Sequence, residues 1–209
     1  MSDRAPELSL IGLTGLPEIR QGDDLGALIV EAVRWLGLEF RPGDILVVTQ
    51  KVVSKAEGRV IPLREATPSP LARSWAVLLD KDPRLVELIL REAKRIVRMD
   101  RGILIAETRH GFICANAGVD RSNLPDQDAA ALLPLDPDGS AKAIRDRILA
   151  LCGIEVAALI SDTFGRPWRE GLTNVAIGVA GFPPLLDYRG QRDEQGRLAK
   201  AMNEIIVEP

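Results

Sequence analysis

The sequence predicts a mixed α/β protein in which a sheet core is interrupted by a helical insertion. Two apolar runs, at residues 45–50 and 155–160, have the length and the flanking turns of buried strands. The stretch at residues 25–37 repeats its apolar side chains with helical period and ends in glycine. Helical patterns then follow one another through residues 70–99, where the core pattern is interrupted.

The composition excludes several classes of protein. The chain has 209 residues, a net charge of −3 and 4% aromatic residues. Nucleic-acid binding is therefore not expected, because neither a basic field nor a stacking surface is indicated. No run is long enough for a membrane span, and the first residues lack the apolar region of a signal peptide, so we expect a cytoplasmic protein. Two cysteines and one histidine, His110, exclude a disulfide framework and a multi-histidine metal site.

The elements before the insertion follow from local signals. Residues 8–16 are expected to form a first strand that leads into a loop, and the Gly-Asp-Asp sequence before the helix at 25–37 is a capping signal. The strand at 45–50 is followed directly by Lys51 and Lys55. These lysines could face a polyphosphate, although a solvated helical turn is the more common reading of such a pattern.

The insertion is placed at about residues 67–99, between core segments at 1–66 and 100–209 of a single domain. It is expected to hold a helix near residues 71–80 and a second at 83–99. A β-hairpin is expected at residues 102–118, with its turn at 109–111.

The carboxyl-terminal part alternates helix and strand. A helix capped by Ser140 and stopped by Gly153 is expected to precede the strand at 155–160. A further strand is expected at 174–181, followed by a short helix and a polar turn, and the last residues resemble part of a strand.

The candidate site lies where the central strand is expected to end. Asp162 and Thr163 offer hard oxygen ligands for Mg²⁺ or Mn²⁺, and Arg166 and Arg169 offer planar forks for phosphate or carboxylate. A second carboxylate, Asp120, follows another predicted strand, with Asn123 close by. From the residues alone, Asp162 and Thr163 could equally cap the next turn, and sequence spacing does not show whether the two loops converge.

Familiar nucleotide-binding and hydrolase motifs are missing from the sequence. It contains no Gly-x-x-x-x-Gly-Lys-Ser/Thr loop, no Gly-x-Gly-x-x-Gly after a strand and no Gly-x-Ser-x-Gly elbow. A nucleotide site would therefore be of an uncommon kind, without a P-loop.

Five longer motifs occur in a fixed order between residues 8 and 197: TGLPEI, VVTQKVVSKAEGR, NAGVDRSN, LDPDGS and SDTFGRPWREG. Together they resemble the coenzyme F-420 γ-glutamyl ligase family, in its bacterial form. The resemblance implies a family-specific mixed α/β fold and a homodimer. It also implies GTP-dependent addition of L-glutamate to F-420-0 through a γ-linkage and an acyl phosphate, assisted by Mn²⁺ or Mg²⁺ at two sites and by K⁺.

The resemblance also assigns roles to single residues. Asp120 and Asp162 correspond to ligands of one metal, and Thr163 to a ligand of the second. Arg166 and Arg169 are our hypothesis for a grip on the substrate phosphate or the glutamate carboxylate. Nucleotide contacts correspond to Leu16, Pro17, Glu18, Ile19, Gln50, Lys51, Lys55 and Asn123.

Two departures from the family pattern are expected to matter. Archaeal relatives have small hydroxyl residues at positions 50 and 51, and family members continue beyond position 209, so the chain is expected to be incomplete at its carboxyl end. This leaves open a related carboxylate–amine ligase for another acidic acceptor, or a non-catalytic protein that binds the nucleotide or the deazaflavin.

Overall fold

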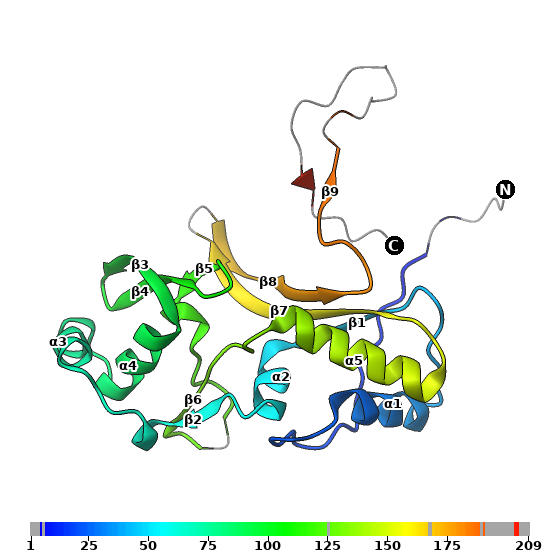
Figure 1. The fold of residues 1–209 in the computed structure, drawn as a ribbon, viewed down its shortest axis with the longest axis horizontal. Coiled ribbons are helices and arrows are strands. Elements are labelled where there is room, and N and C mark those ends of the chain that lie inside the picture. Colours follow the sequence, from blue (N-terminus) through cyan, green and yellow to red (C-terminus); the bar gives the residue numbers. More distant parts are fainter. Residues whose placement is uncertain are drawn as a thin grey trace.

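A computed structural model describes residues 5, 7–124, 126–166, 169–188, 190 and 203–204 (Figure 1). Its elements, in chain order, are α1 (Leu25–Trp35), β1 (Ile45–Thr49), α2 (Gln50–Ala56), β2 (Val60–Pro62), η1 (Leu63–Glu65), α3 (Pro70–Leu79), α4 (Pro83–Glu92), β3 (Ala93–Asp100), β4 (Ile103–Thr108), β5 (Ile113–Ala115), η2 (Asn116–Gly118), β6 (Ala129–Ala131), α5 (Pro137–Cys152), β7 (Ala157–Arg166), β8 (Arg169–Ala180), β9 (Leu186–Asp187) and β10 (Asn203–Glu204). Within these ranges, every helix is too short or too polar to cross a lipid bilayer.

The first hydrophobic core lies between a three-stranded sheet and two helices. Strand β7 is central, parallel to β1 and antiparallel to β8. Helices α1 and α5 lie along one face of this sheet (Figure 1). In β1, Leu46 and Val48 are buried while Ile45 and Val47 are exposed, because successive side chains of a strand point to opposite faces.

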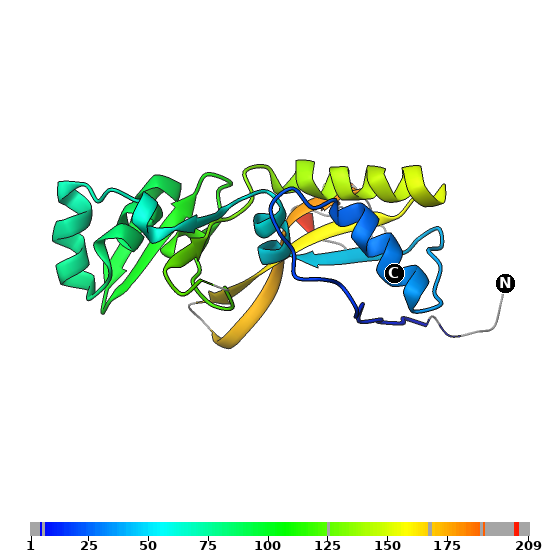
Figure 2. The ribbon, with the colours of Figure 1, turned by 90° about the horizontal axis from the view of Figure 1, so that it is seen from below.

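The second hydrophobic core is built around β3, β4 and β5, which form an antiparallel sheet, and around α3 and α4. Its fully buried side chains include Leu63, Val86, Ile89 and Leu104. The views in Figures 1 and 2 place this unit at one end of an elongated molecule and the α1–α5 layer at the other. The short antiparallel pair β2–β6 lies between them.

Several predicted elements are confirmed. The Asp24 side chain caps α1 by accepting a hydrogen bond from the Ala27 amide at 3.0 Å. The predicted hairpin is the β4–β5 pair, with Glu107 opposite Ile113. The strands expected around residues 45, 106, 113, 159 and 177 are all present, as β1, β4, β5, β7 and β8.

The helix predicted for residues 83–99 is wrong in its second half. Helix α4 ends at Glu92, and the chain turns directly into β3, where Ile96 lies opposite Ala106 of β4. The β-branched residues of this segment fit a pleated surface, and pairing with a strand later in the chain overrides the helical spacing. The extent of the insertion stays a prediction.

Other predicted boundaries also differ from the structure. Residues 8–16 form no strand. Leu8 and Leu10 remain 76% and 89% exposed, without a neighbouring strand among the described residues. Helix α5 begins earlier than predicted, since the carboxylate of Asp136, not Ser140, caps it through the Gly139 amide at 3.0 Å. The expected short helix is replaced at Leu186–Asp187 by strand β9, which pairs with β10, and residues 191–202 lie outside the described part.

Candidate functional site

Asp162 and Thr163 lie within a long hairpin, not in a loop after a strand. Strand β7 continues past its last pair with β1, Thr49 opposite Ser161, and remains paired with β8. Neither residue therefore caps a turn, which settles the alternative that the sequence left open. Because strand side chains alternate, Asp162 shares a face with buried Phe164, while Thr163 lies on the exposed face.

The hydroxyl of Thr163 has a partner on the exposed face. It lies 2.8 Å from the Oδ1 atom of Asn174, the residue opposite it on β8, and donates a hydrogen bond there. Asp162 and Thr163 therefore present their oxygen atoms on opposite faces of β7.

The start of α2 lies beside this hairpin, at the carboxyl edge of the parallel β1–β7 pair. Gln50 follows the last residue of β1 directly, and Lys51 comes next. The Lys51 ammonium donates to the Asp120 carboxylate at 2.6 Å, although the two residues are 69 positions apart in the chain. It also contacts the carbonyl oxygen and the hydroxyl of Ser122, at 2.6 and 3.0 Å.

Asp120 is fixed through its backbone and its side chain. Its amide and carbonyl exchange hydrogen bonds of 3.0 and 2.7 Å with Ala131 of β6. The carboxylate accepts from the Ser122 amide at 2.8 Å and from the Ser122 hydroxyl at 2.7 Å. Partial burial alone would raise the pKa of Asp120, but the hydrogen bonds from Lys51 and Ser122 outweigh it and hold the pKa below the usual range.

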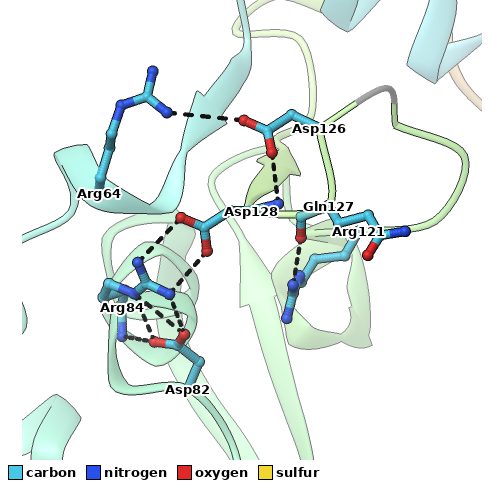
Figure 3. A network of polar contacts seen from close by, with 7 residues as sticks. All are labelled: Arg64, Asp82, Arg84, Arg121, Asp126, Gln127 and Asp128. Atoms are coloured by element: carbon cyan, nitrogen blue, oxygen red, sulfur yellow. Dashed lines mark hydrogen bonds and ion pairs between the residues drawn. The ribbon is translucent and has the colours of Figure 1, made fainter.

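The far end of the Asp120 loop is tied to the second core by a polar network (Figure 3). The Arg121 guanidinium donates to the carbonyl oxygen of Gln127 at 2.6 Å and so closes the loop on itself. Arg84 in the first turn of α4 holds the carboxylate of Asp128 at 2.9 and 3.2 Å and that of Asp82 at 2.7 Å. The loop that carries Asp120 is therefore positioned from both ends.

Asp162 has the opposite electrostatic surroundings to Asp120. Burial raises the pKa of Asp162, and the nearby negative charge of Asp120 raises it further. The Thr163 amide and the Lys51 ammonium act in the other direction without cancelling these effects. The two carboxylates thus lie within electrostatic reach of each other and of one lysine, a convergence that sequence spacing could not establish.

The donor set around Asp120 and Asp162 suits a hard cation. Carboxylate and hydroxyl oxygens are preferred by Mg²⁺ and Mn²⁺. Among the described residues, no three His, Cys, Asp or Glu side chains gather in one place. The carboxylate pair therefore resembles sites where Mg²⁺ takes one or two carboxylates and completes its shell with water and substrate phosphates. A dication would also offset the repulsion between the two carboxylates.

The residues predicted to contact a nucleotide lie in the loop Leu16–Ile19, in α2 and beside Ser122. Lys55, one helical turn after Lys51, forms a 2.5 Å ion pair with Glu18, which joins the predicted loop Leu16–Ile19 to α2. Leu16 is exposed, and Ile19 is buried in the first core. Asn123 is exposed next to Ser122, in a left-handed backbone conformation with φ of 53°.

Gln50 is enclosed in the protein. It is 3% exposed, and its Oε1 atom lies 2.8 Å from the hydroxyl of Ser54, which in turn donates to the Leu132 carbonyl at 2.6 Å. The Ser54 hydroxyl thus joins α2 to the segment after β6, and Gln50 lies buried beside it. Arg166 and Arg169 lie opposite each other at the end of the hairpin, and their side chains lie outside the described part of the structure.

Two polar residues of this region were not singled out from the sequence. Ser122 supplies two of the three oxygen contacts of Lys51, and its spacing from Asp120 is that of an Asx turn, a signal that was available. Asn174 meets Thr163 only through the register of the β7–β8 hairpin, so no local signal could have identified it.

Comparison with known proteins agrees with the motif resemblance. The model of the F420-0:Gamma-glutamyl ligase family matches residues 14–208. A coenzyme F420:L-glutamate ligase of Methanothermobacter thermautotrophicus is 49% identical over 190 residues, which are 91% of this chain and 75% of that protein. The protein of the same name from Methanopyrus kandleri is 50% identical over 183 residues, 88% of this chain and 70% of that protein.

These relatives are archaeal, and a third, from Archaeoglobus fulgidus, is 40% identical over 194 residues, 93% of this chain and 75% of that protein. The expectations of a bacterial form and of a shortened carboxyl end are therefore not confirmed. The mixed α/β fold agrees with the family expectation. On the extent of these matches, the chain belongs to the F420-0:Gamma-glutamyl ligase family.

Proposed function

We propose that this protein is a GTP-dependent ligase that joins L-glutamate through a γ-linkage to F420-0. Relatives with 40–50% identity over most of the chain are named coenzyme F420:L-glutamate ligase. The observation that supports the proposal best is the contact of Lys51 with Asp120 near the carboxyl edge of the β1–β7 pair, within electrostatic reach of Asp162. In open α/β sheets this edge is the usual position of a ligand site.

The proposed chemistry has two steps. The γ-phosphoryl group of GTP passes to the terminal carboxylate of the acceptor, which gives an acyl phosphate and GDP. The amine of L-glutamate then attacks the carbonyl carbon, so that a C–N bond forms, the C–O bond to phosphate breaks and the amine proton is released. Both steps bring anions together, and positive charge must offset their repulsion.

The described residues could supply or hold that positive charge. Asp120 and Asp162 would hold one divalent cation, Mn²⁺ or Mg²⁺, and Thr163 would contribute to a second on the other face of β7. A cation bound there would neutralise charge on the transferring phosphate. Lys55 and the loop Leu16–Ile19 would contact the nucleotide. The ion pair between Lys55 and Glu18 holds this loop beside α2, so one nucleotide could reach both.

The remaining parts of the proposal concern the substrates and the assembly. Arg166 and Arg169, at the end of the hairpin, would grip the substrate phosphate or the glutamate carboxylate. Potassium would assist the reaction. The enzyme would act as a cytoplasmic homodimer, as the family resemblance implies.

A ligation assay tests the proposal. Purified protein is incubated with F420-0, GTP, Mn²⁺ and L-glutamate, and the deazaflavin product is weighed by mass spectrometry. A gain of one or more glutamyl residues is expected, and it should require both GTP and the metal. Asp162→Asn should lose this activity.

A matched variant controls for the removal of one carboxylate. Asp146→Asn changes a surface residue of α5 that pairs with Lys142 and lies on a different element from either site carboxylate, and it should keep full activity. No mass gain with the unmodified protein would refute the proposal. A gain with a different acidic acceptor but none with F420-0 would refute the substrate assignment.

A further inference from the structure

The ammonium group of Lys51 is enclosed by oxygen atoms. Its three neighbours are the Oδ2 atom of Asp120 at 2.6 Å, the Ser122 carbonyl oxygen at 2.6 Å and the Ser122 hydroxyl at 3.0 Å. A lysine ammonium has three hydrogen-bond donors, so this set satisfies it completely. Only 19% of the Lys51 side chain is exposed, although it is a long charged chain.

The same oxygen atoms are the ones that a hard metal ion would use. The Oδ2 atom of Asp120 accepts from both Lys51 and the Ser122 hydroxyl, and Oδ1 accepts from the Ser122 amide. A divalent ion that takes Oδ2 as a ligand would compete for the lone pairs that now accept hydrogen bonds from Lys51 and Ser122. Its charge would also repel an ammonium a few ångströms away.

We propose that Lys51 is a built-in counter-ion which a divalent metal displaces, and that the released ammonium then binds a phosphate of the nucleotide. This inference rests on the metal and nucleotide roles proposed above. It assigns to Lys51 a task beyond nucleotide contact, namely to occupy the carboxylate site until the metal arrives.

The position of Lys51 in α2 allows such a change of partner. The lysine lies in the first turn of the helix, and its flexible four-carbon chain can turn without a change in the backbone. Lys55 lies four residues later, on the same face of α2. An ammonium that swings from Asp120 toward Lys55 would place two positive charges beside one polyphosphate.

A coupling between the two ligands follows. Metal alone binds weakly, because it must break the contacts of Lys51 with Asp120 and Ser122. With a nucleotide present, the displaced ammonium gains a phosphate partner, so metal and nucleotide each strengthen the binding of the other. The site would thus fill with both ligands together.

Mn²⁺ binding without nucleotide tests the displacement directly. Free Mn²⁺ is measured by electron paramagnetic resonance for the unmodified protein, Lys51→Met and Lys55→Met, with circular dichroism to confirm folding. Lys51→Met should bind Mn²⁺ about fivefold more tightly, as expected when a partly exposed competing ion pair is removed. Lys55→Met is the matched control, since it removes the same charge from the same helix but from a residue paired with Glu18, and its Mn²⁺ affinity should stay unchanged.

The nucleotide arm and a labelling experiment complete the test. GDP should increase the Mn²⁺ affinity of the unmodified protein more than that of Lys51→Met. Acetylation of lysines, followed by mass spectrometry, should show Lys51 becoming more reactive with Mn²⁺ and less reactive again with Mn²⁺ and GDP, while surface Lys142 does not change.

Two results would overturn the inference. If Mn²⁺ binds but Lys51→Met binds it no more tightly, or Lys51 reactivity is unaffected by Mn²⁺, displacement does not occur, and the proposed ligase function stands. If neither the unmodified protein nor Lys51→Met binds Mn²⁺, the metal role of the carboxylate pair fails as well. The ligation assay then decides the proposed function separately.

Discussion

Gly178 lies where strand β8 crosses the first turn of α5, and alanine should not fit there. An ideal Cβ at this position would lie 2.4 Å from the carbonyl carbon and oxygen of Pro137 and 2.6 Å from its Cβ. The closest obstacles are backbone atoms, so no side-chain rotation relieves the overlap. Gly178→Ala would therefore have to move the strand away from the helix by about 1 Å to reach ordinary contact.

The cost of this movement has two parts. Overpacking of this kind costs about 1–3 kcal/mol. The shift would also stretch the hydrogen bond of 2.7 Å from the Val179 amide to the Asp138 carboxylate, whose loss at an exposed position costs about 1 kcal/mol. Together these give roughly 3 kcal/mol, which for a chain of this size lowers Tm by about 6–12 °C.

Thermal unfolding followed by circular dichroism measures this effect. Gly12→Ala is the matched control, because an added Cβ at Gly12 meets nothing within 4 Å, and its Tm should change by no more than about 2 °C. A folded Gly178→Ala protein that melts within 2 °C of the unmodified one would refute the close packing of β8 on α5.

Three further predictions concern the site. Asp162→Asn should lower ligation at least about 100-fold yet raise stability to urea at pH 7. Burial raises the pKa of Asp162, so the ionised carboxylate destabilises the folded state at pH 7, and the neutral asparagine removes that cost. At pH 3 the carboxyl is protonated and the stability gain should vanish. Urea unfolding of both proteins at pH 7 and pH 3 measures the difference. Arg84→Gln should lower kcat/KM about tenfold by loosening the Asp120 loop, and unchanged kinetics would show that the contact of Arg84 with Asp128 is dispensable. Lys55→Met should raise the KM for GTP about tenfold with kcat nearly unchanged, in steady-state assays with varied GTP; an unaltered KM would remove Lys55 from the nucleotide site.

Local signals were enough to predict some elements of the fold. Helix α1 carries a capping aspartate before it and a glycine after it, and the β4–β5 hairpin is bounded by a short polar turn. The spacing of the apolar residues in β3 also suits a helix, and only the pairing of this strand with β4 decides between the two. The segment at residues 8–16 has the composition of a strand but no described strand beside it.

The candidate site was predicted as two separate pieces. The positions of Asp120 and Asp162 after apolar runs predict each carboxylate as a site candidate, and their roles remain predictions. The parallel pairing of β1 with β7 brings the start of α2, with Lys51, near Asp162, and the contact between Lys51 and Asp120 spans 69 positions. Spacing in sequence does not determine which strands pair or which distant residues come into contact.

The two carboxylates are carried by different hydrophobic cores. Asp162 lies on β7 between Ile160 and Phe164 of the first core, and Asp120 follows Val119 of the second. The gap that a metal ion would bridge is thus set by how the two cores meet. Under the proposed metal role, the distance between the two carboxylates would determine which ion radius fits best. A core substitution far from both carboxylates could change that distance, so that the site prefers a larger ion over Mg²⁺.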